Sequence, residues 1–316
     1  VARIFYINTA AGQLAEEQIQ VVGNRANGTA PHADSRAILL DSSGTIFYQS
    51  DDGGIFRLFD RSAATRKWVS VNGNLALSET SSLAYDALND ILFNGAQDVG
   101  NQIQTASDSG IWKTFSKGDG NAQGVGILRN AAGEPVFVLR YLLGNTIDTL
   151  QVQVVDLNNN VLRTTKQEFK SDASAATNSA LLEEETEGFV GALPLAVNAI
   201  DPNKIFISGA KRTYESFDRG MTVDYVHADM ATALAYGGWK RDGASAENVA
   251  YAAFNDQIWW RGPAGGAFTQ ATGQPVGATT ITNIVMDRSN WEVAYAVNDK
   301  HVYATIDGGK NWTDIT

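Results

Sequence analysis

The sequence predicts an all-β protein with no long helix, and two observations carry this prediction. Short segments rich in Val, Ile, Phe, Tyr and Thr alternate along the chain with turns of Gly, Asn and Asp, a pattern typical of antiparallel strands. A phrase made of a hydrophobic strand, an Asp, a Gly-containing turn and an aromatic residue also recurs, with its clearest copy at 305–312. A fixed repeat of this kind is typical of folds built from similar stacked units.

The recurring phrase is centred on positions 60, 108, 156, 218, 263 and 307, so successive copies are 44 to 48 residues apart except for one interval of 62. The longer interval contains a polar insertion at 171–188. A repeat of about 45 residues holds four short strands, which is one blade of a β-propeller. We therefore expect residues 1–316 to form a single β-propeller domain of four-stranded antiparallel blades.

The last repeat shows the four expected strands most clearly, separated by turns of Asn, Asp, Gly and Lys. These strands are 282–286, 293–297, 301–305 and 312–315. The same frame fits an earlier repeat at 82–85, 90–93, 102–106 and 111–115. Six repeats can be assigned four strands each in this way.

The first thirty residues match only half a repeat. Residues 3–7 resemble a third strand, Gly12 occupies the turn position, and 18–22 resemble a fourth strand. Either the missing strands belong to a longer chain, or six blades close and residues 1–30 form a capping hairpin. We expect seven blade positions with an incomplete N-terminal blade, and six blades are the alternative.

Composition narrows the class of partner. The net charge of −11 and the pI near 4.7 disfavour nucleic acid and anionic membrane surfaces. The chain has no apolar run of about eighteen residues, so no membrane span is expected. The absence of cysteine excludes disulfides and thiolate metal sites. Because the chain starts at Val1 rather than Met, we expect a secreted or cell-surface protein that is part of a longer chain.

The phrase at 305–312 resembles the Asp-box, or BNR repeat, of the propellers in sialidases, sortilin-type receptors and xyloglucan-specific endoglucanases. This chain departs from the strict pattern at Asn311, Val223 and Pro263, where the family has Thr, Trp and Asp. Further phrases resemble the sortilin and endoglucanase type, at 31–34, 50–57, 95–100 and 118–120. The resemblance implies the propeller fold. It does not imply sialidase activity, because the Arg-Ile-Pro phrase of sialidases is missing near the start.

We expect the Asp-box residues to be structural. The Asp accepts hydrogen bonds from its own turn, the Gly supplies a left-handed backbone conformation, and the aromatic residue packs between sheets. The residues expected in this role are Asp60, Asp108, Asp156, Asp218, Asp307 and Trp312.

A second acidic residue recurs at the turn between the second and third strands of most repeats. These residues are Asp52, Asp98, Asp148, Asp256 and Asp299. Successive hairpin turns alternate between the two ends of a sheet, which places these acids at the end opposite the Asp-boxes. They are either ordinary turn residues or a ring of hard oxygen ligands for calcium.

Two residues are candidates for catalysis. The phrase 49–57 resembles the one that carries the catalytic acid of the two-propeller endoglucanases, and this resemblance implies that role for Asp51. The second acid of that family comes from a second propeller, which this chain lacks. An inverting hydrolase needs two carboxyl groups about 6.5–9.5 Å apart, and Asp119 is the candidate for the second group.

The residues expected to contact a ligand lie near these turns or carry aromatic rings. They are His32, Asp34, Asp52, Gln97, Asp98, Trp259 and Trp260. The two tryptophans suit stacking against sugars, but alternation along a strand turns Trp259 and Trp260 to opposite faces. We expect an extracellular recognition module that binds a glycan or a protein across the face with the second-to-third-strand turns. A glycoside hydrolase that uses Asp51 and an architectural domain of a larger surface protein are the alternatives.

Overall fold

The computed structural model describes residues 5–8, 15–18, 26–32, 34–42, 47–59, 65–73, 78–116, 118–170, 193–275 and 279–316. In this part of the chain the only helix is a 3₁₀ turn at Ile147–Thr149, and everything else regular is strand. The all-β prediction is therefore confirmed. None of the described helices has the length and apolar character needed to cross a membrane.

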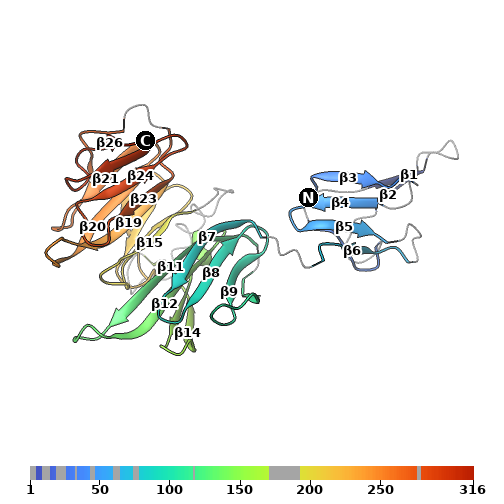
Figure 1. The fold of residues 1–316 in the computed structure, drawn as a ribbon, viewed down its shortest axis with the longest axis horizontal. Coiled ribbons are helices and arrows are strands. Elements are labelled where there is room, and N and C mark those ends of the chain that lie inside the picture. Colours follow the sequence, from blue (N-terminus) through green and yellow to red (C-terminus); the bar gives the residue numbers. More distant parts are fainter. Residues whose placement is uncertain are drawn as a thin grey trace. The chain divides into compact units, whose positions relative to one another are not determined.

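The chain divides into two compact units, which we call unit 1 (residues 1–79) and unit 2 (residues 80–316). In Figure 1 unit 1 is blue, and the colours of unit 2 run from cyan to red. Unit 1 contains a two-stranded sheet, β1 (Phe5–Asn8) with β2 (Ala15–Gln18). It also contains one four-stranded sheet in chain order, β3 (Ala37–Leu40), β4 (Phe47–Asp51), β5 (Gly54–Leu58) and β6 (Trp68–Ser70). Ala26, Leu58 and Trp68 form the small core of this unit.

Unit 2 contains five four-stranded sheets, each an antiparallel meander in chain order. The first is β7 (Thr80–Asp86), β8 (Ile91–Ala96), β9 (Gly100–Gln104) and β10 (Trp112–Thr114). The second is β11 (Gly120–Arg129), β12 (Pro135–Gly144), β13 (Gln151–Val155) and β14 (Val161–Lys166). The third is β15 (Leu195–Val197), β16 (Ile205–Ser208), β17 (Thr213–Ser216) and β18 (Asp224–His227). The fourth is β19 (Ala233–Trp239), β20 (Ser245–Phe254), β21 (Gln257–Arg261) and β22 (Thr269–Gln270), and the fifth is β23 (Asn283–Met286), β24 (Ala294–Val297), β25 (Val302–Thr305) and β26 (Thr313–Asp314).

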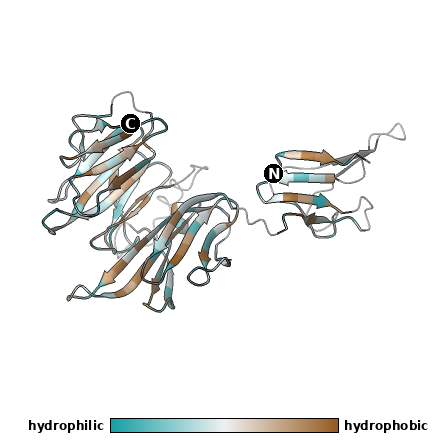
Figure 2. Ribbon diagram, viewed as in Figure 1, coloured by the Kyte–Doolittle hydropathy of each residue, from teal (hydrophilic) through white to brown (hydrophobic). Residues whose placement is uncertain are grey.

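The first strands of these five sheets are successive neighbours, in the order β7, β11, β15, β19 and β23. Each sheet therefore packs against the next around a common axis, which is the blade arrangement of a β-propeller. We name each blade by its strands, for example blade β11–β14. Hydrophobic residues recur along the strands in Figure 2, and the buried ones form cores between blades.

The expectation of seven blade positions was wrong, and the alternative of six is the one observed. The described residues form six four-stranded sheets, one in unit 1 and five in unit 2. The described residues of the N-terminal segment form the pair β1 and β2, which is two strands fewer than a four-stranded blade.

Two large apolar cores lie between pairs of blades. One joins blade β11–β14 to blade β15–β18 and includes Leu139, Tyr141 and Ile205. The other joins blade β19–β22 to blade β23–β26 and includes Tyr251, Tyr303 and Trp312. Two buried tyrosines cross the same interfaces, since the Tyr141 hydroxyl donates to the Pro202 carbonyl at 2.5 Å and the Tyr251 hydroxyl to the Trp291 carbonyl at 2.7 Å.

Buried ion pairs link strands of neighbouring blades. Arg140 on β12 donates to Asp86 on β7, with its Nη2 2.6 Å and its Nε 3.0 Å from Asp86 Oδ2. Arg261 on β21 makes two bonds, of 2.7 and 2.8 Å, to Glu215 on β17, and the Tyr236 hydroxyl donates to the same carboxylate. A buried pair of this kind is strongly destabilising when one partner is removed, because the other charge is left unpaired.

Two of the phrases that resemble Asp-boxes, 216–222 and 305–312, form turns whose Asp side chain accepts backbone hydrogen bonds, and we call these turns the two complete boxes. Asp307 accepts hydrogen bonds from the backbone N–H groups of Lys310 and Asn311, each at 3.0 Å. Asp218 accepts from the N–H of Thr222 at 2.8 Å. Trp312 is buried in the apolar core and donates its Nε1–H to the Gly309 carbonyl at 3.2 Å.

The other box acids behave differently. Asp156 accepts from the N–H groups of Asn158 and Asn160 in an exposed turn. Asp108 has a left-handed backbone with φ of 54°, and none of the described hydrogen bonds uses its carboxylate. Asp60 lies outside the described residues, as does the insertion 171–188.

Both complete boxes also pair with the chain that leaves the preceding blade. Lys170 forms a parallel bridge with Thr222, and Gly273 forms one with Asn311, in each case four residues after the box Asp. The Lys170 N–H donates to the Met221 carbonyl and the Val223 N–H to the Lys170 carbonyl, at 2.8 and 2.9 Å. The bonds around Gly273 repeat this pattern with Lys310 and Trp312. The box is therefore a connection between blades as well as a turn.

Gly309 of the last box gives a test of this interface. Its φ is +87°, and a Cβ there would lie 2.4 Å from Cε1 of Tyr251 in the preceding blade. Gly133 has a similar φ of +82° but open space around it. Gly133→Ala should lower the free energy of unfolding by about 1–2 kcal/mol, because of the strain of a left-handed alanine alone. Gly309→Ala should lower it by about 1–3 kcal/mol more, because the added methyl group overpacks the interface. Equal losses in urea unfolding would show that the box does not pack tightly between blades.

Candidate functional site

Unit 1 gathers several of the predicted residues around Asp51, which ends β4 at a tight hairpin turn. The residue is buried, with 8% of its surface exposed. The side chain of Gln49 donates to Oδ2 and the Gly53 N–H donates to Oδ1, both at 3.0 Å. Burial raises the pKa of Asp51, and this outweighs the hydrogen bonds from Gly53 and Gln49 and the nearby His32, which act in the opposite direction.

Two further polar atoms near this carboxylate have no hydrogen-bond partner among the described residues. They are Oε1 of Gln49, a fully buried residue, and Nδ1 of His32. His32 lies against the hairpin turn, since a Cβ on Gly53 would approach the His32 Cβ to 2.6 Å. A carboxyl group with a raised pKa beside an imidazole is a combination suited to general acid–base chemistry.

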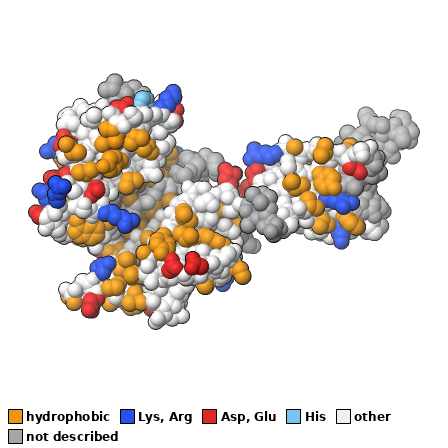
Figure 3. All heavy atoms as spheres, in the orientation of Figure 1, with side chains coloured by type: hydrophobic (Ala, Val, Ile, Leu, Met, Phe, Trp, Pro, Cys, Tyr) orange, Lys and Arg blue, Asp and Glu red, His pale blue; other side chains and the backbone are white. Residues whose placement is uncertain are grey.

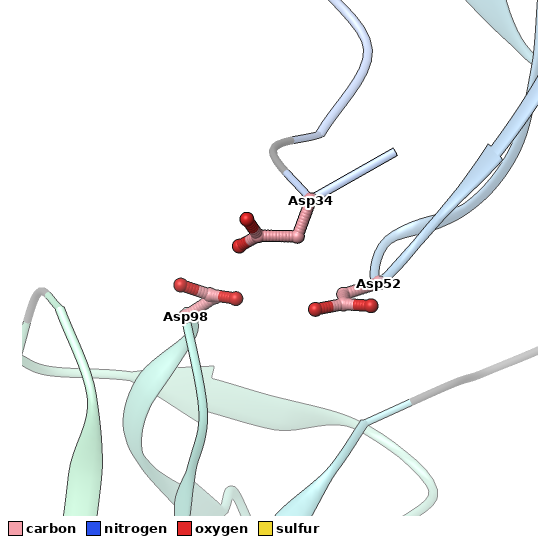
Figure 4. Close-up of side chains that lie close together, drawn as sticks. All are labelled: Asp34, Asp52 and Asp98. Carbon is pink, nitrogen blue, oxygen red and sulfur yellow. The ribbon is translucent and has the colours of Figure 1, made fainter. Parts of the chain in front are cut away.

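Asp34 and Asp52 are two further predicted acids of unit 1, close in sequence to His32 and Asp51. The guanidinium of Arg36 forms a bidentate pair with Asp52, with bonds of 2.9 and 3.2 Å. Carboxylate oxygens of Asp34 and Asp52 lie within 4.8 Å of one another (Figure 4). Asp98, also drawn in that figure, belongs to unit 2 and is described with it.

The predicted acids of unit 2 do lie at the turns between second and third strands. Asp98 is in the β8–β9 turn beside Gln97, and its N–H donates to Asp119 at 2.8 Å, so Asp119 holds this turn. Asp148 lies 3.6 Å from the Lys166 ammonium. Asp256 and Asp299 are exposed in their turns. Within unit 2, the described acidic side chains form no group of three whose oxygens lie within 4.8 Å.

The two tryptophans face opposite sides of β21, as alternation predicted. Trp259 lies edge-on to His227 at 5.2 Å and to Phe254 at 6.2 Å. Trp260 lies against Gly309 of the next blade, with the Lys310 ammonium 5.7 Å from its ring centre. They therefore do not form one stacking surface.

A cavity of about 200 Å³ lies where the five first strands of unit 2 begin, and we call it the axial cavity. These strand ends are next to the turns between second and third strands, since Thr80 pairs with Ala96 and Ala233 with Ala253. No charged residue lines the cavity. Its polar lining consists of Ser81, Ser82, Asn121, Gln123, Thr232, Thr282 and Asn283.

Hydrogen bonds between blades fix the polar groups of this lining. Asn121 Oδ1 accepts from the Leu193 N–H of the next blade at 2.7 Å. Gln123 donates to Asn101 Oδ1 at 2.7 Å, and its own N–H donates to Ser82 Oγ at 3.0 Å. Gln123 is 8% exposed and its Oε1 has no partner. The cavity therefore presents a rigid set of neutral donors and acceptors.

Sequence reasoning missed the axial cavity because it searched for charged and aromatic residues. The available signal was a neutral polar residue at or just before the start of most first strands. Figure 3 shows basic and acidic side chains scattered among hydrophobic ones on the face in view, without a concentrated patch of either sign.

Comparisons with known proteins assign no family. No protein-family model matches the chain, and no curated protein matches it. Among solved structures, the chain is similar to the WD40 β-propeller domain of Doa1, with 14% sequence identity and a TM-score of 0.45 over 91% of this chain and 84% of that one. This likeness is too weak to carry an argument, so the propeller assignment rests on the blade topology described above.

The environment of Asp51 gives a prediction about its pKa. Gln49→Leu removes a hydrogen bond that lowers this pKa, so the pKa of Asp51 should rise further above the ordinary value of 3.8. Carboxyl-carbon NMR titration measures it. Asp156 serves as the internal control, because hydrogen bonds from Asn160 and Asn158 hold its pKa below the ordinary value.

The raised pKa of Asp51 also determines how the stability of unit 1 depends on pH. The folded state holds the Asp51 proton more tightly than the unfolded chain does, so unit 1 loses stability as pH rises from the ordinary pKa through the raised one. A pKa of Asp51 at or below 3.8 in the unsubstituted protein would contradict the buried environment described here.

Proposed function

We propose that this chain is a recognition module that binds an uncharged, hydroxyl-rich ligand, a glycan, at the axial cavity of unit 2. The neutral, rigid lining of the axial cavity is the observation that carries this proposal. Sugar hydroxyls are both donors and acceptors, and they match a lining of Ser, Thr, Asn and Gln side chains. Gln123 Oε1, buried and without a partner, is an acceptor for one such hydroxyl.

The size of the cavity limits what enters it. Sites for drug-sized ligands have volumes of about 300–1,000 Å³, and the axial cavity has about 200 Å³. It therefore suits one sugar residue, with the remainder of the chain lying across the second-to-third-strand turns. A protein loop is the alternative occupant of this face. A secreted or cell-surface location and a calcium site at the Asp turns remain predictions attached to this proposal.

Filling the cavity tests the proposal. Thr282 is exposed and lines the cavity, so Thr282→Trp should abolish binding to a glycan array by occupying the site. Thr164→Trp is the matched control, because Thr164 is equally exposed but lies on β14 away from the cavity. Binding that survives Thr282→Trp, or no binding to any glycan, would contradict the proposal.

A glycoside hydrolase is the second candidate, and the raised pKa of Asp51 beside His32 is the observation that favours it. A carboxylic acid whose pKa is raised by burial is suited to act as a general acid on a glycosidic oxygen. Asp119, which holds the β8–β9 turn, remains the predicted second acid.

Reducing-end release from a polysaccharide panel tests this candidate. If the chain is a hydrolase, Asp51→Asn should lower release by about 10²–10⁴-fold, the usual contribution of a general acid. Asp156→Asn, in an exposed turn of unit 2, should leave release unchanged. No release from any substrate rejects the hydrolase, and no release together with no glycan binding leaves the architectural alternative.

A further inference from the structure

A second cavity of unit 2 lies between two blades, away from the axis. It is a groove of about 430 Å³ between the outer strands of blade β11–β14 and two turns of blade β15–β18, and we call it the interblade groove. We propose that the interblade groove binds a short peptide segment of a partner protein that carries an acidic side chain next to an apolar one. This proposal is independent of the function proposed for the axial cavity.

Two arginines give the groove unused hydrogen-bond donors. Arg163 on β14 is exposed and forms no ion pair or hydrogen bond with a described residue. Arg219 donates its Nε–H to Asn203 Oδ1 at 2.9 Å, which orients its guanidinium, while its Nη groups have no partner among the described residues. A guanidinium with free Nη groups matches the geometry of a carboxylate.

Two acids also line the groove, and three of their four carboxylate oxygens already accept hydrogen bonds from the chain. Asp218 accepts from Ser216 Oγ, the Thr222 N–H and Thr222 Oγ1 within its box. Oδ1 of Asp201 accepts from both the N–H and the Nδ2 of Asn203. The free groups of the groove are therefore mainly donors, and an acidic side chain complements them.

Gln167 supplies a buried acceptor at the same place. It lines the groove, only 4% of the residue is exposed, and its Oε1 has no hydrogen-bond partner. An unsatisfied buried acceptor lowers stability, so its presence beside a cavity points to a ligand that donates to it. A peptide backbone N–H is such a donor.

The apolar part of the lining favours a peptide over a sugar or a simple anion. Val152 and Val154 on β13 lie on the same face as Arg163 and Thr165, because Val154 pairs with Arg163 and Val152 with Thr165. Phe217, 49% exposed, and Met221 face them from the box turn. Val152 is buried in the core beneath the groove, so the partly exposed Val154, Phe217 and Met221 are the side chains that receive an apolar peptide side chain, while the arginines receive the acidic one.

The volume of the groove agrees with this assignment, whereas the net charge of the molecule opposes it at long range. The volume of the groove lies in the range of about 300–1,000 Å³ typical of small-ligand sites, which holds a few residues. The chain as a whole carries a net charge of −11, so it does not attract acidic peptides at long range. Binding of an acidic peptide therefore requires a local site.

The test uses the full chain and fluorescence anisotropy. The probes are labelled hexapeptides that each carry one glutamate and one leucine at varied spacing, and a matched set with glutamine in place of glutamate. We expect binding only in the glutamate set, and weaker binding at high salt. Arg163→Gln should weaken it roughly three- to tenfold. Arg129→Gln, an exposed arginine on β11 outside the groove, should leave it unchanged.

Gln167→Met separates a ligand-binding role from a structural one. It removes the unsatisfied acceptor at nearly constant volume, so the unfolding temperature should stay the same or rise while peptide affinity falls. If this variant fails to fold, Arg163→Gln alone decides. Equal binding of both peptide sets, no binding of either, or full affinity in Arg163→Gln would overturn the proposal. Thr282→Trp at the axial cavity should leave peptide binding intact, so failure here and failure of the glycan proposal are distinguishable.

Discussion

Burial of both faces of each four-stranded sheet is the constraint on which unit 2 depends. A single blade has too little interior to fold alone, so its apolar faces must be covered by the blades on either side. The two large cores lie between blades for this reason. The buried pairs Asp86–Arg140 and Glu215–Arg261 contribute less to net stability than the apolar area does. They do penalise any packing that leaves one charge unpaired.

Fold class, blade size and strand positions could be predicted from the sequence because they depend on local chemistry. Alternating hydrophobic residues and Gly or Asp turns set the strands of blade β23–β26 almost residue by residue. The number of blades could not be predicted from local chemistry in this way. A half repeat at the start of the chain has the same local pattern whether it completes a blade or stands as a hairpin, and only tertiary pairing separates the two.

The candidate sites also have features that the sequence predicted and features that it did not. The place of Asp51 at a hairpin and the positions of the turn acids followed from motif and strand alternation, but the burial of Asp51 depends on His32 and Gln49, which a sequence does not bring together. The axial cavity and the interblade groove were not predicted at all. Each is lined by strands far apart in the chain, and a residue such as Gln167 carries no local sign of its position.

The two complete boxes occur in alternate blades, so two pairs among the five blades of unit 2 are joined by a box. Each box bonds its blade to the chain that leaves the preceding one, and the same pairs of blades share the two large cores. Blades β11–β14 and β15–β18 are thus joined by both kinds of contact, as are blades β19–β22 and β23–β26. Between blades β15–β18 and β19–β22 the described residues form no box bridge, and the contact there is a smaller core around Phe206 and Tyr236 together with the buried pair Glu215–Arg261. Unit 2 is therefore held by two kinds of boundary. Those with a box depend on apolar area and backbone hydrogen bonds, whereas the boundary between them depends on a charge pair that destabilises the fold strongly when one partner is removed.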